Sequence, residues 1–127
     1  RSAIETGNEQ LAETAFSEVK KIASGEVAAE AWYYDAFFKH KNGKHEASNI
    51  SVQKLVKDYA GYKEWGGKGL VLMAKNFYAL DDAFQATYIL ESVIDNFAEF
   101  DDVVDEAKTE LRRIKTEEAK TNSSIDV

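Results

Sequence analysis

Apolar side chains along this chain recur at every third or fourth position, a spacing that is typical of an amphipathic helix and not of a strand. The first such series begins at Leu11 and continues through Ala12, Ala15, Phe16, Val19, Ile22 and Ala23. The chain has no Pro and only seven Gly among 127 residues, so few positions oppose helix formation. The pattern therefore predicts an all-α fold.

Turn-forming residues divide the pattern into six predicted helices. These helices cover residues 9–23, 27–41, 44–59, 63–80, 82–96 and 101–118, and a disordered tail is expected over 120–127. Asn42 and Gly43 end the second helix, and Asp81 is expected to cap the fifth. The Gly-rich stretch 66–69 predicts a frayed or kinked start of the fourth helix, because each interior Gly costs about 0.5–1 kcal/mol relative to Ala.

Short connections make neighbouring helices antiparallel, which leaves a closed bundle or an open stack of helical hairpins. An internal repeat favours the stack. Three segments each carry a turn residue followed five positions later by Ala: Gly7 and Ala12, Asn42 and Ala47, Asp81 and Ala86. Upstream of the last two, "AWYYDAFFKHK" and "LVLMAKNFYAL" also align, with Phe38 matching Phe77 at a period of 39 residues.

These segments resemble the tetratricopeptide repeat, a helix–turn–helix unit of about 34 residues. The C-terminal half is similar in particular to the repeats of bacterial cell-envelope proteins of this family. The resemblance implies one domain over 1–119, with the second helix of one repeat, complete repeats at 27–59 and 63–97, and a capping helix. It further implies a right-handed superhelix, a longer parent array, and a bacterial periplasmic or envelope location rather than a cytoplasmic one. The Pro that closes each repeat in the family is absent here.

An aromatic cluster occupies the second predicted helix. Tyr34, Phe37 and Phe38 lie on its apolar face, and Trp32 and Tyr33 lie beside that face. One hairpin cannot bury both of its faces alone, so large side chains are needed between successive hairpins. We interpret most of the cluster as core and inter-hairpin packing, whereas Trp32 and Tyr33 suit packing and ligand contact equally.

Stacked hairpins expose a concave groove that is lined by the first helix of each repeat. The resemblance places these residues in the groove: Trp32, Lys39, His40, Lys68, Val71, Lys75 and Tyr78. It implies a non-enzymatic scaffold that binds a segment of a partner protein. Because this set is basic and aromatic on a chain of net charge −7, the hypothesis is an acidic or C-terminal carboxylate segment. The alternative is that the lysines are ordinary solvated side chains.

Other chemistry finds little support in the sequence. The net charge of −7 argues against a nucleic-acid module, and no apolar run reaches the roughly 18 residues of a membrane-spanning helix. His40 and His45 are separated by a helix break, whereas metal-binding His pairs on one helix are three or four positions apart. With no Cys and no activated Ser, there is no candidate nucleophile. We therefore expect no catalytic residue, metal or cofactor.

Two further functions stay open at this point. The first is a self-associating structural protein of the bacterial cell envelope, forming a homodimer that buries Trp32 or Tyr33 between the copies. The second is an enzyme or cofactor binder built on a helical bundle. The lack of an ionisable cluster on any apolar face counts against this second alternative.

Overall fold

Helices joined by short turns make up the part of the chain that the structure describes. The computed structural model describes residues 25–126, with side chains through residue 121. Its helices are α2 (Gly25–Lys41), α3 (His45–Asp58), α4 (Lys63–Ala79), α5 (Ala83–Asn96) and α6 (Asp101–Asp126). These residues contain no strand, so the all-α prediction is confirmed for them. The predicted helix over 9–23 lies outside the described residues.

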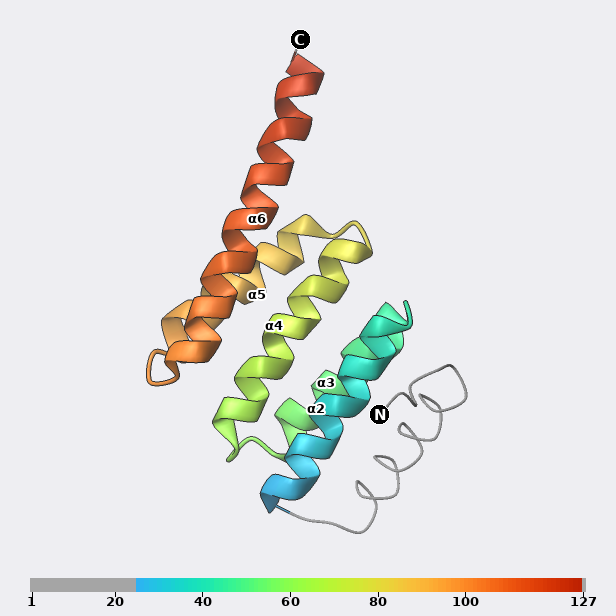
Figure 1. Ribbon diagram of the computed structural model, residues 1–127, viewed down its shortest axis with the longest axis vertical. Helices are drawn as coiled ribbons and strands as arrows, with labels where there is room; N and C mark the ends of the chain where they lie inside the picture. The colour runs from blue at the N-terminus through green and yellow to red at the C-terminus, as the bar shows by residue number, and fades with distance from the viewer. Residues whose placement is uncertain (1–24, 127) are drawn as a thin grey trace, which may run out of the picture.

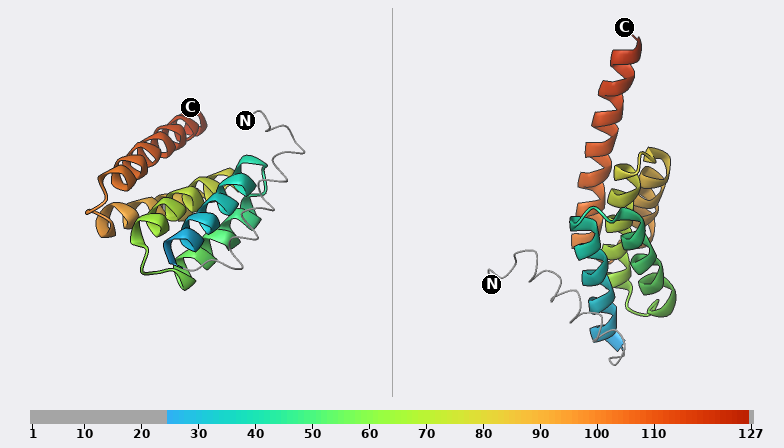
Figure 2. Two further views of the ribbon diagram at one scale, coloured as in Figure 1. Left: turned by 60° about the horizontal axis from the view of Figure 1, so that its bottom comes forward. Right: turned by 90° about the vertical axis from the view of Figure 1, so that its right-hand side faces the viewer.

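The helices form two layers. In Figure 1, α2, α4 and α6 lie side by side in front of α3 and α5, and the right-hand view of Figure 2 shows the two layers edge-on. Antiparallel hairpins are formed by α2 with α3 and by α4 with α5, and α6 packs against both α5 and α4. The helices α2 and α6, at the two edges of the front layer, do not pack against each other. The described helices are therefore stacked hairpins with open edges.

A repeat of 38 residues relates the helices to one another. Each of α4, α5 and α6 begins 38 residues after its counterpart, as the pairs Gly25 and Lys63, His45 and Ala83, and Lys63 and Asp101 show. The period of 39 inferred from aligning Ala47 with Ala86 is therefore wrong by one residue. Ser48 is the true counterpart of Ala86, and both are fully buried.

The two hairpin turns have the same backbone geometry. Gly43 and Asp81 both have positive φ, at 80° and 67°, and the next amide in each turn donates to a carbonyl five residues back. Such a left-handed residue commonly ends a helix. Asp81 therefore ends α4 and does not cap α5, contrary to the sequence prediction. The cap is Asp82, whose Oδ1 accepts from the amide of Gln85 at 3.0 Å.

Helix α4 runs through its glycines without interruption, so the predicted frayed or kinked start is wrong. Gly67 and Gly69 are buried where neighbouring chain segments come closest. A Cβ at Gly67 would lie 2.9 Å from both Phe97 Cδ2 and Val103 Cγ1, and one at Gly69 would lie 3.0 Å from Leu55 Cδ2. The glycines let α3 and the start of α6 approach the α4 backbone, which outweighs their low helix propensity.

Helix α6 is longer than the sequence predicts. It extends to Asp126 and so covers most of the stretch 120–127 for which the sequence predicts a disordered tail. Its first part packs on α4 and α5 through Val103, Ala107 and Ile114, which are buried. Its C-terminal end projects beyond the other helices in Figure 1.

Two adjacent glycines allow a matched test of this packing. Gly66→Ala should stabilise the fold by about 0.5–1 kcal/mol, because a Cβ there meets nothing within 4 Å and helix propensity improves. Gly67→Ala should instead destabilise it by about 1–3 kcal/mol, because the methyl group overpacks against Phe97 and Val103. Urea unfolding measures both changes. Stabilisation in both variants would show that these neighbours have room to move.

Candidate partner-binding groove

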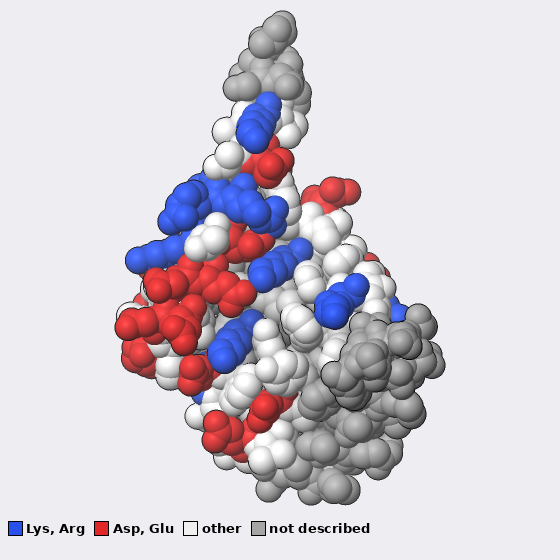
Figure 3. Space-filling model, in the orientation of Figure 1, with Lys and Arg blue, Asp and Glu red and all other residues white. Residues whose placement is uncertain are grey.

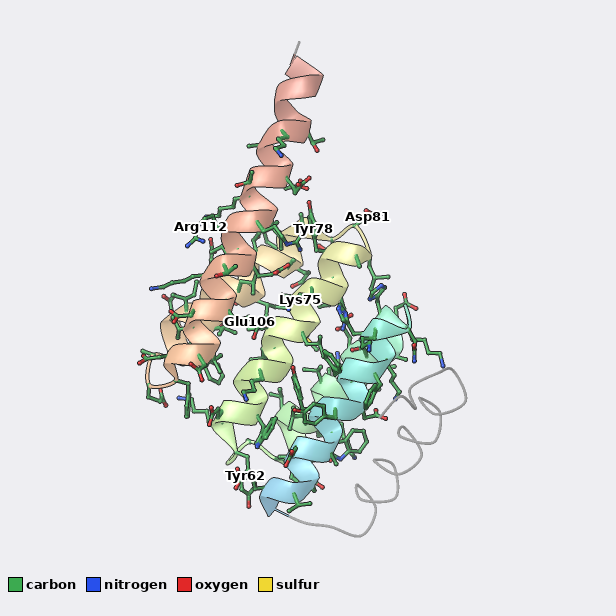
Figure 4. All side chains as sticks on the ribbon, in the orientation of Figure 1. Tyr62, Lys75, Tyr78, Asp81, Glu106 and Arg112 are labelled. Carbon is green, nitrogen blue, oxygen red and sulfur yellow. The ribbon has the colours of Figure 1, made fainter. Side chains whose placement is uncertain are left out.

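The front layer has a hollow to which all three of its helices contribute. Its volume is about 80 Å³, and its lining is Tyr33, Phe37, His40, Lys68, Leu72, Lys75 and Glu106. We call the surface formed by these residues the front groove. Two of the lining side chains, Lys75 of α4 and Glu106 of α6, are labelled in Figure 4.

Three of the seven sequence-predicted groove residues meet in the front groove, namely His40, Lys68 and Lys75. Val71 does not. Its side chain points from α4 into the core and is fully buried, so its assignment to the exposed groove is incorrect. Trp32 is half-buried on α2, outside the lining of the hollow. Tyr78 lies one turn beyond Lys75, at the C-terminal end of α4, where its hydroxyl donates to Glu118 Oε2 at 3.1 Å.

Lys39 is turned toward α3 instead of the groove. Its Nζ lies 2.8 Å from Asp35 Oδ2 and donates to Ser51 Oγ at 3.0 Å. Ser51 in turn donates to the same Asp35 oxygen at 2.5 Å. Asp35 and Ser51 are buried, so this ion pair holds α2 against α3 and satisfies a carboxylate inside the protein.

The two lysines of the front groove have different surroundings. Lys75 Nζ lies 2.9 Å from Glu106 Oε2, which neutralises its charge. Lys68 Nζ lies 4.7 Å from the centre of the Trp65 ring, within cation–π range, and makes no ion pair with a described carboxylate. Figure 3 shows positive and negative side chains mixed over this face. The front groove is therefore mixed in charge, not basic as the sequence suggested.

Two aromatic side chains of α2, Tyr33 and Phe37, form one wall of the groove, and further rings pack beside them between the two hairpins. Tyr33 of α2 lies 5.6 Å from Trp65 of α4, centre to centre, and Tyr34 lies 6.1 Å from it. Tyr33 and Phe37 also pack against the buried cluster of Ala36, Val52, Leu72 and Met73. This arrangement agrees with the interpretation of the aromatic cluster as packing between hairpins. Burial raises the pKa of Tyr33 to about 12, with smaller contributions from Glu106 and Tyr34.

The groove ends at a buried polar network that sequence reasoning missed. The turn after α2 brings the rings of His40 and His45 to 5.4 Å, centre to centre, although they lie on different helices. Their Nδ1 atoms donate to Asn76 Oδ1 at 2.7 Å and 2.9 Å. Asn76 Nδ2 donates to Ser48 Oγ at 2.8 Å and Asn49 Oδ1 at 2.9 Å.

This network uses all the hydrogen-bonding capacity of the Asn76 amide, which is fully buried. It joins the end of α2 and the start of α3 to the last turn of α4. A signal for it was present, because Asn76 interrupts the apolar series "LVLMAKNFYAL". The described residues hold no group of three or more His, Asp or Glu placed to bind a metal ion. None of the described helices is long and apolar enough to span a membrane.

Charge reversal at Lys39 should affect stability and not only binding. Lys39→Glu places a second carboxylate beside buried Asp35 and should lower the free energy of unfolding by about 3 kcal/mol. Lys57→Glu makes the same change at an exposed position on α3 and should alter it by less than about 0.5 kcal/mol. Urea unfolding of the two variants measures both changes in the free energy of unfolding. Equal effects would mean that the Lys39–Asp35 pair does not hold α2 to α3.

Tyr33 should make the protein lose stability at alkaline pH. Its pKa is about 12 in the fold and 10.0 in its absence, so the unfolded chain releases this proton first. The Tyr33 contribution is intact below pH 10 and is lost as the pH rises toward 12. Tyr33→Phe should remove this part of the loss, as measured by urea unfolding at several pH values. Identical pH dependence in the two proteins would contradict the raised pKa.

The chain was also compared with protein-family models, curated proteins and solved structures. No family model, curated protein or solved structure matches it.

Proposed function

We propose that this chain is a non-enzymatic protein-interaction module that binds a segment of a partner protein along the front groove. One observation carries the proposal. Helices at successive 38-residue intervals lie side by side and together line one hollow with aromatic, cationic and anionic side chains. A surface built in this way recognises an extended ligand, because each repeat adds a similar helix to the same face.

The proposal includes a tetratricopeptide-like arrangement of the hairpins. Its support is the order of packing, in which each first helix contacts its own hairpin partner and the first helix of the next unit. Small residues at the hairpin crossings, Ser48 and Ala86, also fit this arrangement. The period of 38 residues is longer than the family's roughly 34. The chain also lacks the Pro that usually closes each repeat.

The chemistry of the groove narrows the type of partner segment. Lys39 and Lys75 are already paired with Asp35 and Glu106, so the acidic-segment hypothesis now depends on Lys68. We expect a partner segment with one carboxylate that contacts Lys68. An apolar or aromatic side chain of the segment would lie next to it, against Tyr33 and Phe37. A strongly acidic segment would leave its further carboxylates without a cationic partner, because Lys75 is already paired with Glu106.

A displayed library of random peptides, selected on the purified chain, tests this proposal. Peptides enriched on the wild type should bind the Lys68→Glu variant at least roughly 10-fold more weakly, since a groove contact of this kind is worth about 1.4 kcal/mol or more. Lys57→Glu, with the same charge change on α3, should bind them normally. Failure to enrich any peptide, or equal loss in both variants, would contradict binding in the front groove.

A further inference from the structure

A second surface, between α5 and α6, is apolar and uncovered in the described residues. Phe84 and Tyr88 are 78% and 62% exposed and lie one turn apart on the outer face of α5. Beside them is a hollow of about 410 Å³, lined by Ala83, Phe84, Thr87, Ile114, Lys115, Glu118 and Ala119. We call this the α5/α6 hollow. Large aromatic side chains exposed beside an open hollow are typical of an interaction surface.

The internal repeat shows what is unusual about this hollow. By the 38-residue period, Ala83, Thr87 and Ile114 correspond to His45, Asn49 and Asn76. Those three counterparts fill the junction between α3 and α4 with a polar network. At the junction between α5 and α6, small and apolar residues leave the corresponding space open. The second junction therefore lacks the side chains that seal the first one.

We propose that the α5/α6 hollow is covered by a second copy of this chain, in a two-fold symmetric dimer. Such an interface uses the same surface twice, so it must be complementary to itself. The protruding Phe84 ring lies at the rim of a hollow large enough to receive an aromatic side chain. In a two-fold arrangement, each Phe84 fills the hollow of the other copy.

The charges around the hollow are also complementary to themselves. Lys115 and Glu118 both line it and lie one turn apart on α6. Within the chain, Lys115 Nζ lies 3.6 Å from Glu91 Oε2 in an exposed ion pair, and Glu118 accepts from the Tyr78 hydroxyl, so both side chains would have to share or exchange these partners. If two α6 helices meet in antiparallel orientation, Lys115 of each copy faces Glu118 of the other. The pairing of opposite charges across the two-fold axis selects this orientation over a parallel one, in which like charges would meet.

The size of this surface sets the strength of the dimer. Two Phe84 and two Tyr88 side chains would together bury about 600–1,000 Å², taking 150–250 Å² for each aromatic residue. Stable interfaces usually bury more than about 1,200 Å², so the dimer is weak. We expect a dissociation constant on the order of 10–100 μM. The surface is distinct from the front groove, so the dimer does not depend on the proposed function.

Sedimentation equilibrium over a range of concentrations tests the dimer. The wild type should show a monomer–dimer equilibrium, and Phe84→Glu should weaken it by at least roughly 10-fold. Ile50→Glu is the matched control, because Ile50 is 65% exposed on α3 and the change in charge is the same. Circular dichroism would check that both variants are folded. A wild type that stays monomeric, or equal loss in both variants, would overturn the proposal.

Charge reversals test the two-fold pairing itself. Lys115→Glu alone and Glu118→Lys alone each place like charges across the axis and should weaken self-association. A mixture of these two variants restores both opposite-charge pairs, so it should form a heterodimer as strong as the wild-type dimer. The double variant should likewise self-associate normally. If the mixture associates no better than either variant alone, Lys115 does not face Glu118 of the other copy.

Discussion

The fold depends on α4, which packs against all four of the other described helices. A helix in this position must be narrow where its neighbours cross it, and α4 meets this requirement with Gly67, Gly69 and Ala74, which are all buried. The same helix places Asn76 where α2 and α3 meet, and directs Lys68 and Lys75 to the exposed face. The core, the polar network and the front groove therefore share one element, and a change on α4 affects both hairpins.

Much of the helical architecture could be predicted from local sequence. For the four helices from α2 to α5, the predicted boundaries lie within about two residues of those in the structure. The reason is that the apolar period and turn residues such as Gly43 are local signals. The repeat register was missed by one residue. The alignment matched Ala47 to Ala86, whereas packing accepts Ser48, whose hydroxyl donates to the carbonyl of Ala36 at 2.7 Å. Identity between residue types is a weaker guide to register than the space available at a helix crossing.

The site was harder to predict, because its properties arise from contacts between helices. Lys39 was assigned to the groove by helix position, but the buried Asp35 one turn earlier draws it toward α3. The glycines of α4 looked unfavourable by helix propensity alone, and their benefit is visible only with Phe97 and Val103 in place. His40 and His45 were set aside because a break separates them, yet the turn at that break brings them together.

The two junctions between hairpins should respond differently to mechanical load. At the first junction, between α3 and α4, Asn76 is hydrogen-bonded to four side chains. Such directional bonds resist twisting of one hairpin against the next. At the second, α6 is held by the apolar contacts of Val103, Ala107 and Ile114 and by polar contacts nearer the surface, without a comparable buried hydrogen-bond network. Bending would therefore concentrate at α6, with the earlier hairpins moving as one stiff unit. The front groove would then widen on the side of Glu106 while its aromatic wall keeps its shape.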